Sequence, residues 1–340
     1  MIVSWEEVPH SGQNGPITGY LLYYTNTTFS DTINIIGGEN RAYTLTELRP
    51  YTNYTVTVSA YNDAGTGPTS DNRTQQTEQA KPTSFPENII FSSVKARSLT
   101  VLWDEVPPSG QNGPITGYLL NYTNATFSDT LNITGGENRA YTLTELRPYT
   151  NYTMTVSAYN DAGTGPTSDN RIQQTEQAKP TSSPENIIFS SVEARSLNVS
   201  WDEVSGQNGP ITGYLLYYTN TTFSDTINIT GGGNRSYTLT ELRPYTNYTV
   251  TVSAYNDAGT GPTSDNRTRQ TEQAEPTSSP ENITFPLVEA RSLIVSWEEV
   301  PHSGQNGPIT GYLLYYTNTC LLYTSPSPRD RTRSRMPSSA

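Results

Sequence analysis

The chain is poor in the residues on which disulfide-bonded, metal-binding and membrane-spanning proteins depend. Its 340 residues include one cysteine, Cys320, and two histidines, His10 and His302. A lone cysteine excludes an internal disulfide, and each histidine lies in a turn with no second metal ligand of its type nearby, so we expect no metal site. No apolar run approaches the roughly 18 residues of a membrane span, and residues 1–30 lack a signal-peptide pattern. We therefore expect any membrane anchor to lie outside this chain.

Basic charge is also scarce. The chain has 20 Lys and Arg against 32 Asp and Glu, a net charge of −12. Nucleic-acid binding requires basic residues concentrated on one face, so it is not expected, and the acidic excess mainly confers solubility. Only 33% of the residues are hydrophobic, a composition that disordered chains share. Regularly spaced Trp, Leu and Val argue instead for folded repeats, because an unfolded linker has no reason to keep them in strand register.

The abundant residues are Thr, Tyr, Asn, Ser, Gly and Pro, which suit short strands and turns. Four tryptophans mark a period of domain length, at Trp5, Trp103, Trp201 and Trp297. They predict units at residues 1–80, 81–178 and 179–274, and a partial unit with three strands at 275–319. The first unit lacks its first strand, because Met1 aligns with Leu99 inside the second strand of the next unit.

One stretch organises each unit. From Tyr54 to Asn62 apolar and polar residues alternate, which predicts a strand with one buried and one solvent-exposed face. Pro50 precedes this strand and a Gly-rich turn follows it. Nearly the same sequence as residues 48–62 recurs at residues 146–160 and 242–256. In the complete second unit we predict seven strands, at residues 86–94, 98–103, 115–122, 129–133, 140–146, 152–160 and 167–172. Seven short strands in under a hundred residues predict an all-β, two-sheet sandwich.

These motifs together resemble the fibronectin type III domain, over about residues 1–319. The resemblance rests on Trp103, Gly-Pro-Ile-Thr-Gly-Tyr at 113–118, Leu146-x-Pro148-x-Thr150-x-Tyr152, Val156, Ala158, Asn160, Gly163 and Gly165. It implies tandem seven-stranded immunoglobulin-like sandwiches without disulfides, each with a tyrosine corner in which the Tyr hydroxyl bonds to an upstream backbone group. The structural core residues it marks are Trp5, Trp103, Trp201, Trp297, Tyr54, Tyr152, Tyr248, Leu48, Leu146 and Leu242.

Both ends of the chain depart from the repeat. Residues 320–340 resemble a translated sequencing-library adapter and are predicted to be a non-native, disordered tail; the alternative is a basic Ser/Pro/Arg tail that recruits a partner or is phosphorylated. Residues 2–27 are identical to residues 294–319. This identity indicates either a higher-order repeat of 292 residues or an error in the assembly of the nucleotide sequence, in which near-identical repeats were joined.

No pattern in the sequence points to a catalytic, cofactor or metal site. The carboxylate pairs after each tryptophan, as at Glu6-Glu7 and Asp104-Glu105, are adjacent on a strand and so face opposite ways, which favours solvated charge over calcium binding. Gly65-Thr66-Gly67 joins two predicted strands, whereas a phosphate-binding loop leads into a helix. Arg-Gly-Asp does not occur.

Asn-x-Ser/Thr sequons are the most informative chemical signal. Where they fall in predicted strands they take outward positions, as Asn198 does between inward Leu197 and Val199, and a glycan needs such a face. The candidates for N-glycosylation are Asn26, Asn53, Asn72, Asn121, Asn124, Asn132, Asn151, Asn198, Asn220, Asn228, Asn234, Asn247, Asn266 and Asn282.

The sequence therefore predicts a non-enzymatic, extracellular array fragment with N-linked glycans, cell-surface or secreted. Its function would be cell adhesion, binding of other cell-surface proteins, or spacing within a receptor ectodomain. The resemblance extends in style to receptor tyrosine phosphatases and neural adhesion receptors, so one alternative is an ectodomain piece of such a phosphatase. Others are an intracellular, muscle-type scaffold, against which the sequons argue, and an accessory module of a secreted hydrolase.

Overall fold

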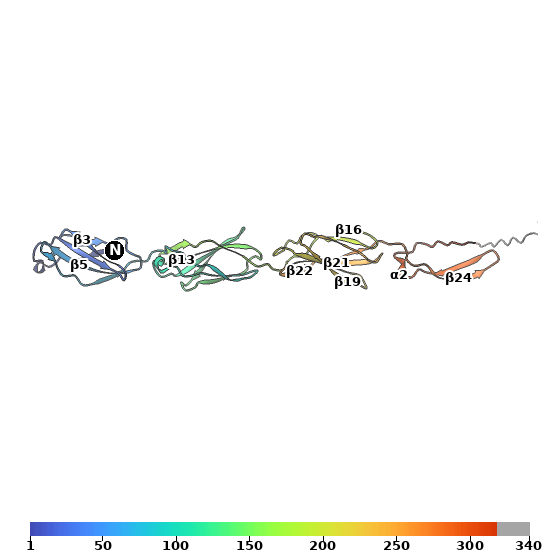
Figure 1. Ribbon diagram of the computed structural model, residues 1–340, viewed down its shortest axis with the longest axis horizontal. Helices are drawn as coiled ribbons and strands as arrows, with labels where there is room; N and C mark the ends of the chain where they lie inside the picture. The colour runs from blue at the N-terminus through green and yellow to red at the C-terminus, as the bar shows by residue number, and fades with distance from the viewer. Residues whose placement is uncertain (318–340) are drawn as a thin grey trace, which may run out of the picture.

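A computed structural model of the protein describes residues 1–317, and the predicted tail at 320–340 lies outside these described residues. Three β-sandwiches and an open fourth unit follow one another in a line (Figure 1). The chain is nearly all β, as the alternation of apolar and polar residues predicted, and the helical turns of the described part are only three or four residues long. The sequence periodicity therefore sets the fold class.

The second unit shows the complete arrangement. One sheet has three strands, in the order β12 (Ala140–Leu143), β9 (Leu99–Leu102) and β8 (Ile90–Val94). The other has five, in the order β11 (Ser128–Thr134), β10 (Gly117–Thr123), β13 (Asn151–Asn160) and β14 (Gly163–Thr167), with β15 (Arg171–Gln174) also paired to β13. A four-residue helix, α1 (Pro108–Gln111), connects the two sheets.

The third unit repeats this topology strand for strand. Its three-stranded sheet is β16 (Ile188–Val192), β17 (Leu197–Ser200) and β20 (Ser236–Leu239). Its five-stranded sheet contains β19 (Ser224–Thr230), β18 (Gly213–Thr219), β21 (Asn247–Asn256), β22 (Gly259–Thr263) and β23 (Arg267–Gln270). Unit three has a shorter turn in place of α1, because its loop between β17 and β18 is two residues shorter than the loop between β9 and β10.

The first unit has one strand fewer in its smaller sheet. That sheet contains β1 (Ile2–Ser4) and β4 (Ala42–Thr44). A short 3-10 turn, η1 (His10–Gly12), lies between β1 and β2. The larger sheet contains β3 (Ser30–Ile36), β2 (Gly19–Thr25), β5 (Asn53–Asn62), β6 (Gly65–Thr66) and β7 (Arg73–Gln76). Where β9 pairs on both edges, β1 pairs with β4 alone among the described residues.

The fourth unit is an open hairpin of β24 (Glu281–Val288) and β25 (Leu293–Glu298), followed by α2 (His302–Gln305). The sequence predicted three strands here, but residues 311–317, the described part of the third, form no strand. A strand needs a hydrogen-bonded neighbour, and the two strands that flank β10 in unit two, β11 and β13, have no counterpart in the described part of unit four.

Two further predictions for the second unit differ from the structure. The single last strand predicted at 167–172 is two strands, β14 and β15, because Ser168 turns its hydroxyl onto the backbone N–H of Val156 at 2.9 Å and interrupts the ladder. The strand predicted at 140–146 ends at Leu143, because Glu145 takes a left-handed backbone conformation with φ of 59°.

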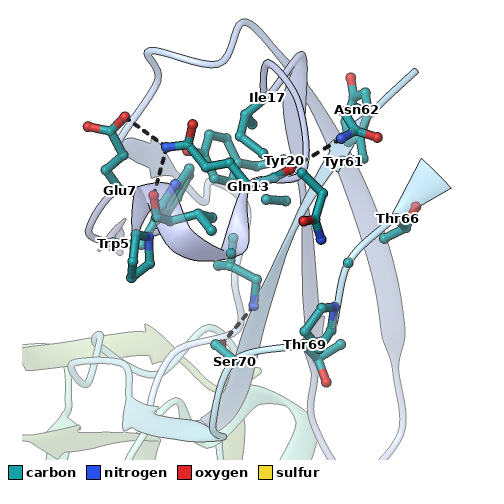
Figure 2. Close-up of a pocket in the computed structure, with 18 of the residues that line it drawn as sticks. Trp5, Glu7, Gln13, Ile17, Tyr20, Tyr61, Asn62, Thr66, Thr69 and Ser70 are labelled. Atoms are coloured by element: carbon teal, nitrogen blue, oxygen red, sulfur yellow. Dashed lines mark hydrogen bonds between the residues drawn. The ribbon is translucent and has the colours of Figure 1, made fainter. Parts of the chain in front are cut away.

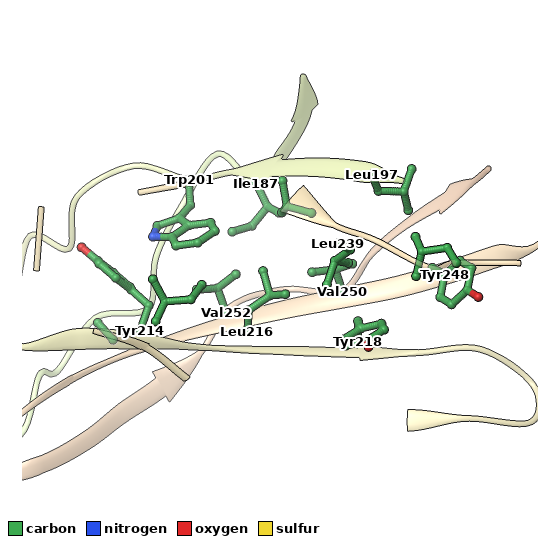
Figure 3. Packing of buried hydrophobic residues seen from close by; sticks show 14 of the residues in the cluster. Ile187, Leu197, Trp201, Tyr214, Leu216, Tyr218, Leu239, Tyr248, Val250 and Val252 are labelled. Carbon is green, nitrogen blue, oxygen red and sulfur yellow. The ribbon is translucent and has the colours of Figure 1, made fainter. Parts of the chain in front are cut away.

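Each sandwich is held by one buried cluster between its sheets. In the third unit Trp201 packs edge-on against Tyr214 with ring centroids 5.3 Å apart, and Leu216, Val250 and Val252 fill the space beside them (Figure 3). Alternate positions of β18 and β21 supply seven of the fifteen buried residues of this cluster, as the period-two pattern requires.

Candidate functional site

The predicted tyrosine corners form in all three sandwiches. The Tyr54 hydroxyl accepts a hydrogen bond from the Arg49 N–H at 3.1 Å, and Tyr152 and Tyr248 accept the equivalent bonds at 3.0 Å. Each of these three rings is 3% exposed. The corners therefore fix the entry into the longest strand of each unit and are structural.

The other predicted core residues are buried only in the complete units. Trp103, Trp201, Leu146 and Leu242 are at most 4% exposed. The equivalent Trp5 and Leu48 of unit one and Trp297 of unit four are partly exposed. The difference follows from the strand pairing, because among the described residues β1 has one partner strand and β25 has one, whereas β9 and β17 have two each.

The polar candidates lie on the surface. Glu105 pairs with Arg139 at 3.4 Å, and Asp104 accepts from the Asn88 side chain at 2.7 Å, so the two carboxylates serve different neighbours. Across residues 1–317, no group of three or more His, Cys, Asp or Glu side chains is placed to hold a metal ion. The Gly-rich stretch after β5 is the turn of a hairpin in which Asn62 pairs with Gly65.

The described part of the chain also contains no helix long and apolar enough to cross a membrane.

None of the sequon asparagines is buried, and several recur at equivalent places. Asn53, Asn151 and Asn247 are exposed at the first position of β5, β13 and β21. Asn26, Asn124 and Asn220 lie in a turn in which the side-chain oxygen accepts from the backbone N–H two residues later, at 2.8–2.9 Å. Exposed Asn72 and Asn266 precede a strand, and exposed Asn132 and Asn228 accept from Tyr hydroxyls at 2.8 Å.

Four sequon asparagines use their amide nitrogen, the atom that would carry a glycan, in a hydrogen bond. Asn121 and Asn198 donate to a cross-strand Thr hydroxyl at 3.1 and 2.7 Å. Asn234 donates to the Thr230 carbonyl at 2.7 Å, and Asn282 to the Glu298 carboxylate at 2.7 Å. A glycan at these positions would first have to displace that bond.

A groove of about 630 Å³ lies in unit one. We call it the unit-one groove. Its walls are Trp5 and the following loop, Tyr20 on β2, Asn62 at the end of β5, and residues 65–70, as Figure 2 shows. Gln13 closes one end, donating to the Val8 carbonyl at 2.8 Å, and Val58 donates its N–H to Ser70 at 3.0 Å at the other.

In the second unit, the equivalent groove holds the segment that leads into it. The Ala80 N–H donates to the Asn112 carbonyl at 3.0 Å, and Asn160 Nδ2 donates to the Ala80 carbonyl at 2.8 Å. Asn112 Nδ2 donates to the Lys81 carbonyl at 3.0 Å, and Thr83 N–H to the Gly110 carbonyl at 2.8 Å. The third unit holds residues 178–181 by the same set of bonds.

Glycines show how closely the segment approaches. A Cβ placed on Gly165 would lie 2.7 Å from Pro82, and one on Gly261 would lie 2.8 Å from Pro180. The equivalent Gly67 of unit one meets only the Ala60 carbonyl oxygen, at 3.3 Å, and a Cβ on Gly65 would meet nothing within 4 Å. Residues 65–67 of unit one are therefore less closely covered than their equivalents in units two and three, where the preceding segment lies against them.

The same comparison appears in the core below the groove. Val156 and Ala158 of β13 are 0% exposed, and Val106 is also 0% exposed. Their counterparts in unit one, Val58, Ala60 and Val8, are partly exposed. Sequence reasoning predicted the missing first strand but not the groove, because the groove is made by residues of unit one that are distant in sequence; the alignment of Met1 inside a strand was the available signal.

Residues 1–76, 84–174 and 182–270 match the family described as "Fibronectin type III domain". Over 296 residues the chain is 31% identical to Contactin-2 of Mus musculus, covering 84% of this chain and 28% of that protein. It is 31% identical over 331 residues to Cell adhesion molecule DSCAML1 of Homo sapiens, covering 92% and 16%. Tyrosine-protein phosphatase Lar of Drosophila melanogaster is 28% identical over 311 residues, covering 87% and 15%. The chain thus spans less than a third of each of these relatives.

Proposed function

We propose that this chain, which belongs to the fibronectin type III domain family, is part of an extracellular array that spaces and presents surfaces for binding other cell-surface proteins. The recurrence of exposed sequon asparagines at the same structural positions carries the proposal. Chance sequons in an Asn- and Thr-rich chain need not avoid the core, whereas glycan acceptors must. Similarity to a protein named a cell adhesion molecule supports the same reading.

The junctions between units suit a spacer. The Glu78 carbonyl accepts from the Tyr51 N–H of unit one at 3.0 Å, and two residues later the Ala80 N–H bonds to unit two at 3.0 Å. Gln79, between them, donates to Asp161 of unit two at 3.3 Å. At this junction only Gln79 has no backbone hydrogen bond to either unit, so a single residue separates the bonded segments of neighbouring units.

Catalysis is not part of the proposal for this segment. If the parent protein is a receptor-type tyrosine phosphatase, an alternative favoured by the similarity to Lar, its phosphatase activity would reside in a separate domain. Long-read sequencing of the full-length transcript tests this alternative directly. An in-frame phosphatase domain would support it, and a transcript that encodes none would exclude it.

Glycosidase treatment of the native protein tests the extracellular assignment. We expect an increase in gel mobility on removal of N-glycans, with glycans mapped at Asn53, Asn151 and Asn247, whose side chains are exposed. Asn234 provides the internal comparison, since its amide nitrogen is engaged at 2.7 Å and we expect lower occupancy there. Native protein with no mobility change would refute the extracellular assignment and favour an intracellular scaffold.

A further inference from the structure

We propose that a second copy of this chain pairs with the edge strand β3 of unit one, strand against strand, and that N-glycans at Asn132 and Asn228 keep the equivalent edges of units two and three from doing the same. This edge does not depend on the ends of the chain. In units two and three the preceding segment is present as β8 and β16 of the smaller sheet, and β11 and β19 are still outermost in the larger one. The glycan half of the inference rests on the proposed extracellular function, and the pairing of β3 does not.

In the complete units, the other sheet edges carry irregularities that oppose pairing with another chain. The ladders of β8, β16, β14 and β22 each contain a register shift, and β12, β15, β20 and β23 have four residues each. β3, β11 and β19 have seven residues each and pair along their whole length without a shift. A long, regular edge strand presents its unpaired backbone groups to any other strand.

The backbone of β3 alternates between bonds to β2 and groups that face the open side. Just beyond the strand, the Gly37 N–H donates to the Thr18 carbonyl at 2.9 Å, and the register of the ladder continues from this pair without a shift. In an antiparallel ladder every second residue bonds to the same neighbour, so the odd-numbered residues of β3 bond to β2. The N–H and C=O groups of Thr32, Asn34 and Ile36 therefore face the open side.

Two of these open groups are already hydrogen-bonded by side chains of unit one. The Thr32 N–H donates to the Asp31 carboxylate at 2.7 Å, and the Ile36 carbonyl accepts from the Asn40 amide at 2.6 Å. The groups left over are the N–H and C=O of Asn34, the Thr32 carbonyl and the Ile36 N–H, and none of these four has a hydrogen bond in the described structure.

The four remaining groups are complementary to themselves under a two-fold axis. If two copies of β3 lie antiparallel with Asn34 opposite Asn34 of the second copy, both groups of each Asn34 are bonded, and each Ile36 N–H meets the Thr32 carbonyl of the other copy. The groups that the side chains cap, the Thr32 N–H and the Ile36 carbonyl, are the two that would otherwise face each other. The open edge therefore matches a second copy of the same strand, and a two-fold contact of this kind closes at a dimer.

The side chains on both faces suit the same register. On the inner face Ile33 lies opposite Ile35 of the second copy, which continues the apolar cluster of unit one across the contact. On the outer face Ile36, which is 78% exposed, lies opposite Thr32 of the second copy. Asp31 lies opposite a glycine, so no like charges meet.

Units two and three have the same edge with a sequon at its centre. Side chains cap the same two backbone groups at 2.6–2.8 Å. The residue on the axis is Asn132 in unit two and Asn228 in unit three, and each begins a sequon. The equivalent Asn34 does not, because Ile36 stands where a sequon needs Ser or Thr. A glycan on the axis occupies the space that a second strand requires, so these edges stay closed.

A tyrosine orients each of the two acceptors. Tyr159 on β13 reaches across β10 above Gly117 and donates its hydroxyl to Asn132 Oδ1 at 2.8 Å, and Tyr255 donates to Asn228 Oδ1 at the same distance. The Nδ2 of each asparagine has no hydrogen bond in the described structure. The oxygen is therefore held toward the middle of the sheet, and the nitrogen that carries the glycan is free on the edge strand.

Sedimentation velocity of the full chain, secreted from a glycosylating cell and compared over rising concentration, tests the pairing. We expect a monomer–dimer equilibrium with no larger species, and slower hydrogen exchange at residues 32–36 in the dimer. Asn34→Pro removes the N–H on the axis and keeps the bonds to β2, because that N–H faces the open side. It should weaken the dimer about 10- to 100-fold, the effect of losing two backbone hydrogen bonds.

Unit two supplies the matched comparison for the glycan. Asn132→Gln removes the acceptor and keeps the N–H on the axis, so a second edge opens and species larger than a dimer should form. Asn132→Pro removes the acceptor and the N–H together, so the dimer should remain the largest species. Peptide mapping by mass spectrometry establishes in parallel which sequons of the unaltered chain carry a glycan.

Ile36→Thr gives the converse test, because it completes a sequon at Asn34. The glycosylated variant should stay monomeric at concentrations where the unaltered chain dimerises. Adding Asn34→Gln removes the acceptor and keeps the other change, so the double variant should dimerise again.

The results that would overturn the proposal are separate for its two halves. A chain that stays monomeric at every concentration, or equal dimerisation of the unaltered chain and a folded Asn34→Pro variant, would overturn the pairing of β3. With a glycan mapped at Asn132, equal behaviour of Asn132→Gln and Asn132→Pro would overturn the role of the glycan, as would equal behaviour of Ile36→Thr with and without Asn34→Gln. A chain without glycans at any sequon would refute the proposed extracellular function instead, and Asn34→Pro would still decide the pairing of β3.

Discussion

The tyrosine corner of unit two allows a quantitative test of the fold. Tyr152→Phe removes one oxygen atom and keeps the ring, which is 3% exposed and lies 6.4 Å from Tyr122 between centroids. The loss is therefore the hydrogen bond from the Arg147 N–H at 3.0 Å, with little change in packing. Such a bond contributes about 0.5–1.5 kcal/mol, and a partly buried N–H left without a partner raises the cost to about 1–3 kcal/mol.

The matched control lies three residues away. Tyr149 is 45% exposed, and in the described contacts its hydroxyl has no protein partner, so Tyr149→Phe should change stability by less than about 0.5 kcal/mol. For a unit of this size, a loss of 1 kcal/mol lowers Tm by about 4–8 °C. Calorimetry gives the shift, and hydrogen exchange assigns it to unit two, since units one and three keep their own corners. Equal shifts for the two variants, or no shift for Tyr152→Phe, would refute the structural role of the corner.

Three further predictions concern the same sandwiches. Gly117→Ala should destabilise unit two by about 2 kcal/mol or more in a urea titration, because its Cβ would overlap a backbone carbonyl oxygen and the Tyr159 ring, whereas Gly233→Ala, where nothing lies within 4 Å, should be neutral. Thr175→Val should cost about 1–3 kcal/mol by the same measurement, because the Thr175 hydroxyl, 1% exposed, donates to the Arg147 carbonyl at 2.7 Å and accepts a backbone N–H at 3.0 Å. Burial raises the pKa of Tyr118 in the folded state above its usual value of about 10, so the folded state holds this proton more tightly than the unfolded state does. The Tyr118 contribution to the free energy of unfolding should therefore be constant below about pH 10 and fall as the pH rises through the raised pKa. Tyr118→Phe should reduce that fall.

The sequence was most informative where side chains alternate. The strand predicted from Tyr152 to Asn160 is β13, one residue longer, because alternation along a strand reports directly which face is buried. The helix α1 was missed although Pro108 stands at its first turn, since four residues are too few for a helical period to show. The end of β12 was missed because a left-handed glutamate, Glu145, is set by the turn around it and not by its own preference.

The groove lay beyond sequence reasoning for a related physical reason. Its walls come from residues as distant in the sequence as Trp5 and Ser70, which approach only after the sheets have paired. Alternation identifies which residues face inward, but it does not report which inward faces remain uncovered. That difference became visible by comparing Val58 with Val156, identical in type and equivalent in place, and unequal in burial.

The one-residue junctions have a geometric consequence for a longer array. The same three residue types, Glu, Gln and Ala, connect each unit to the next at 78–80, 176–178 and 272–274, and each Gln-Ala pair lies against the Gln-Asn-Gly turn of the unit that follows. Identical junctions impose an identical rotation from one unit to the next. An array built from many such units would therefore wind as a superhelix of constant pitch, and any feature carried once per unit would trace a regular spiral along it.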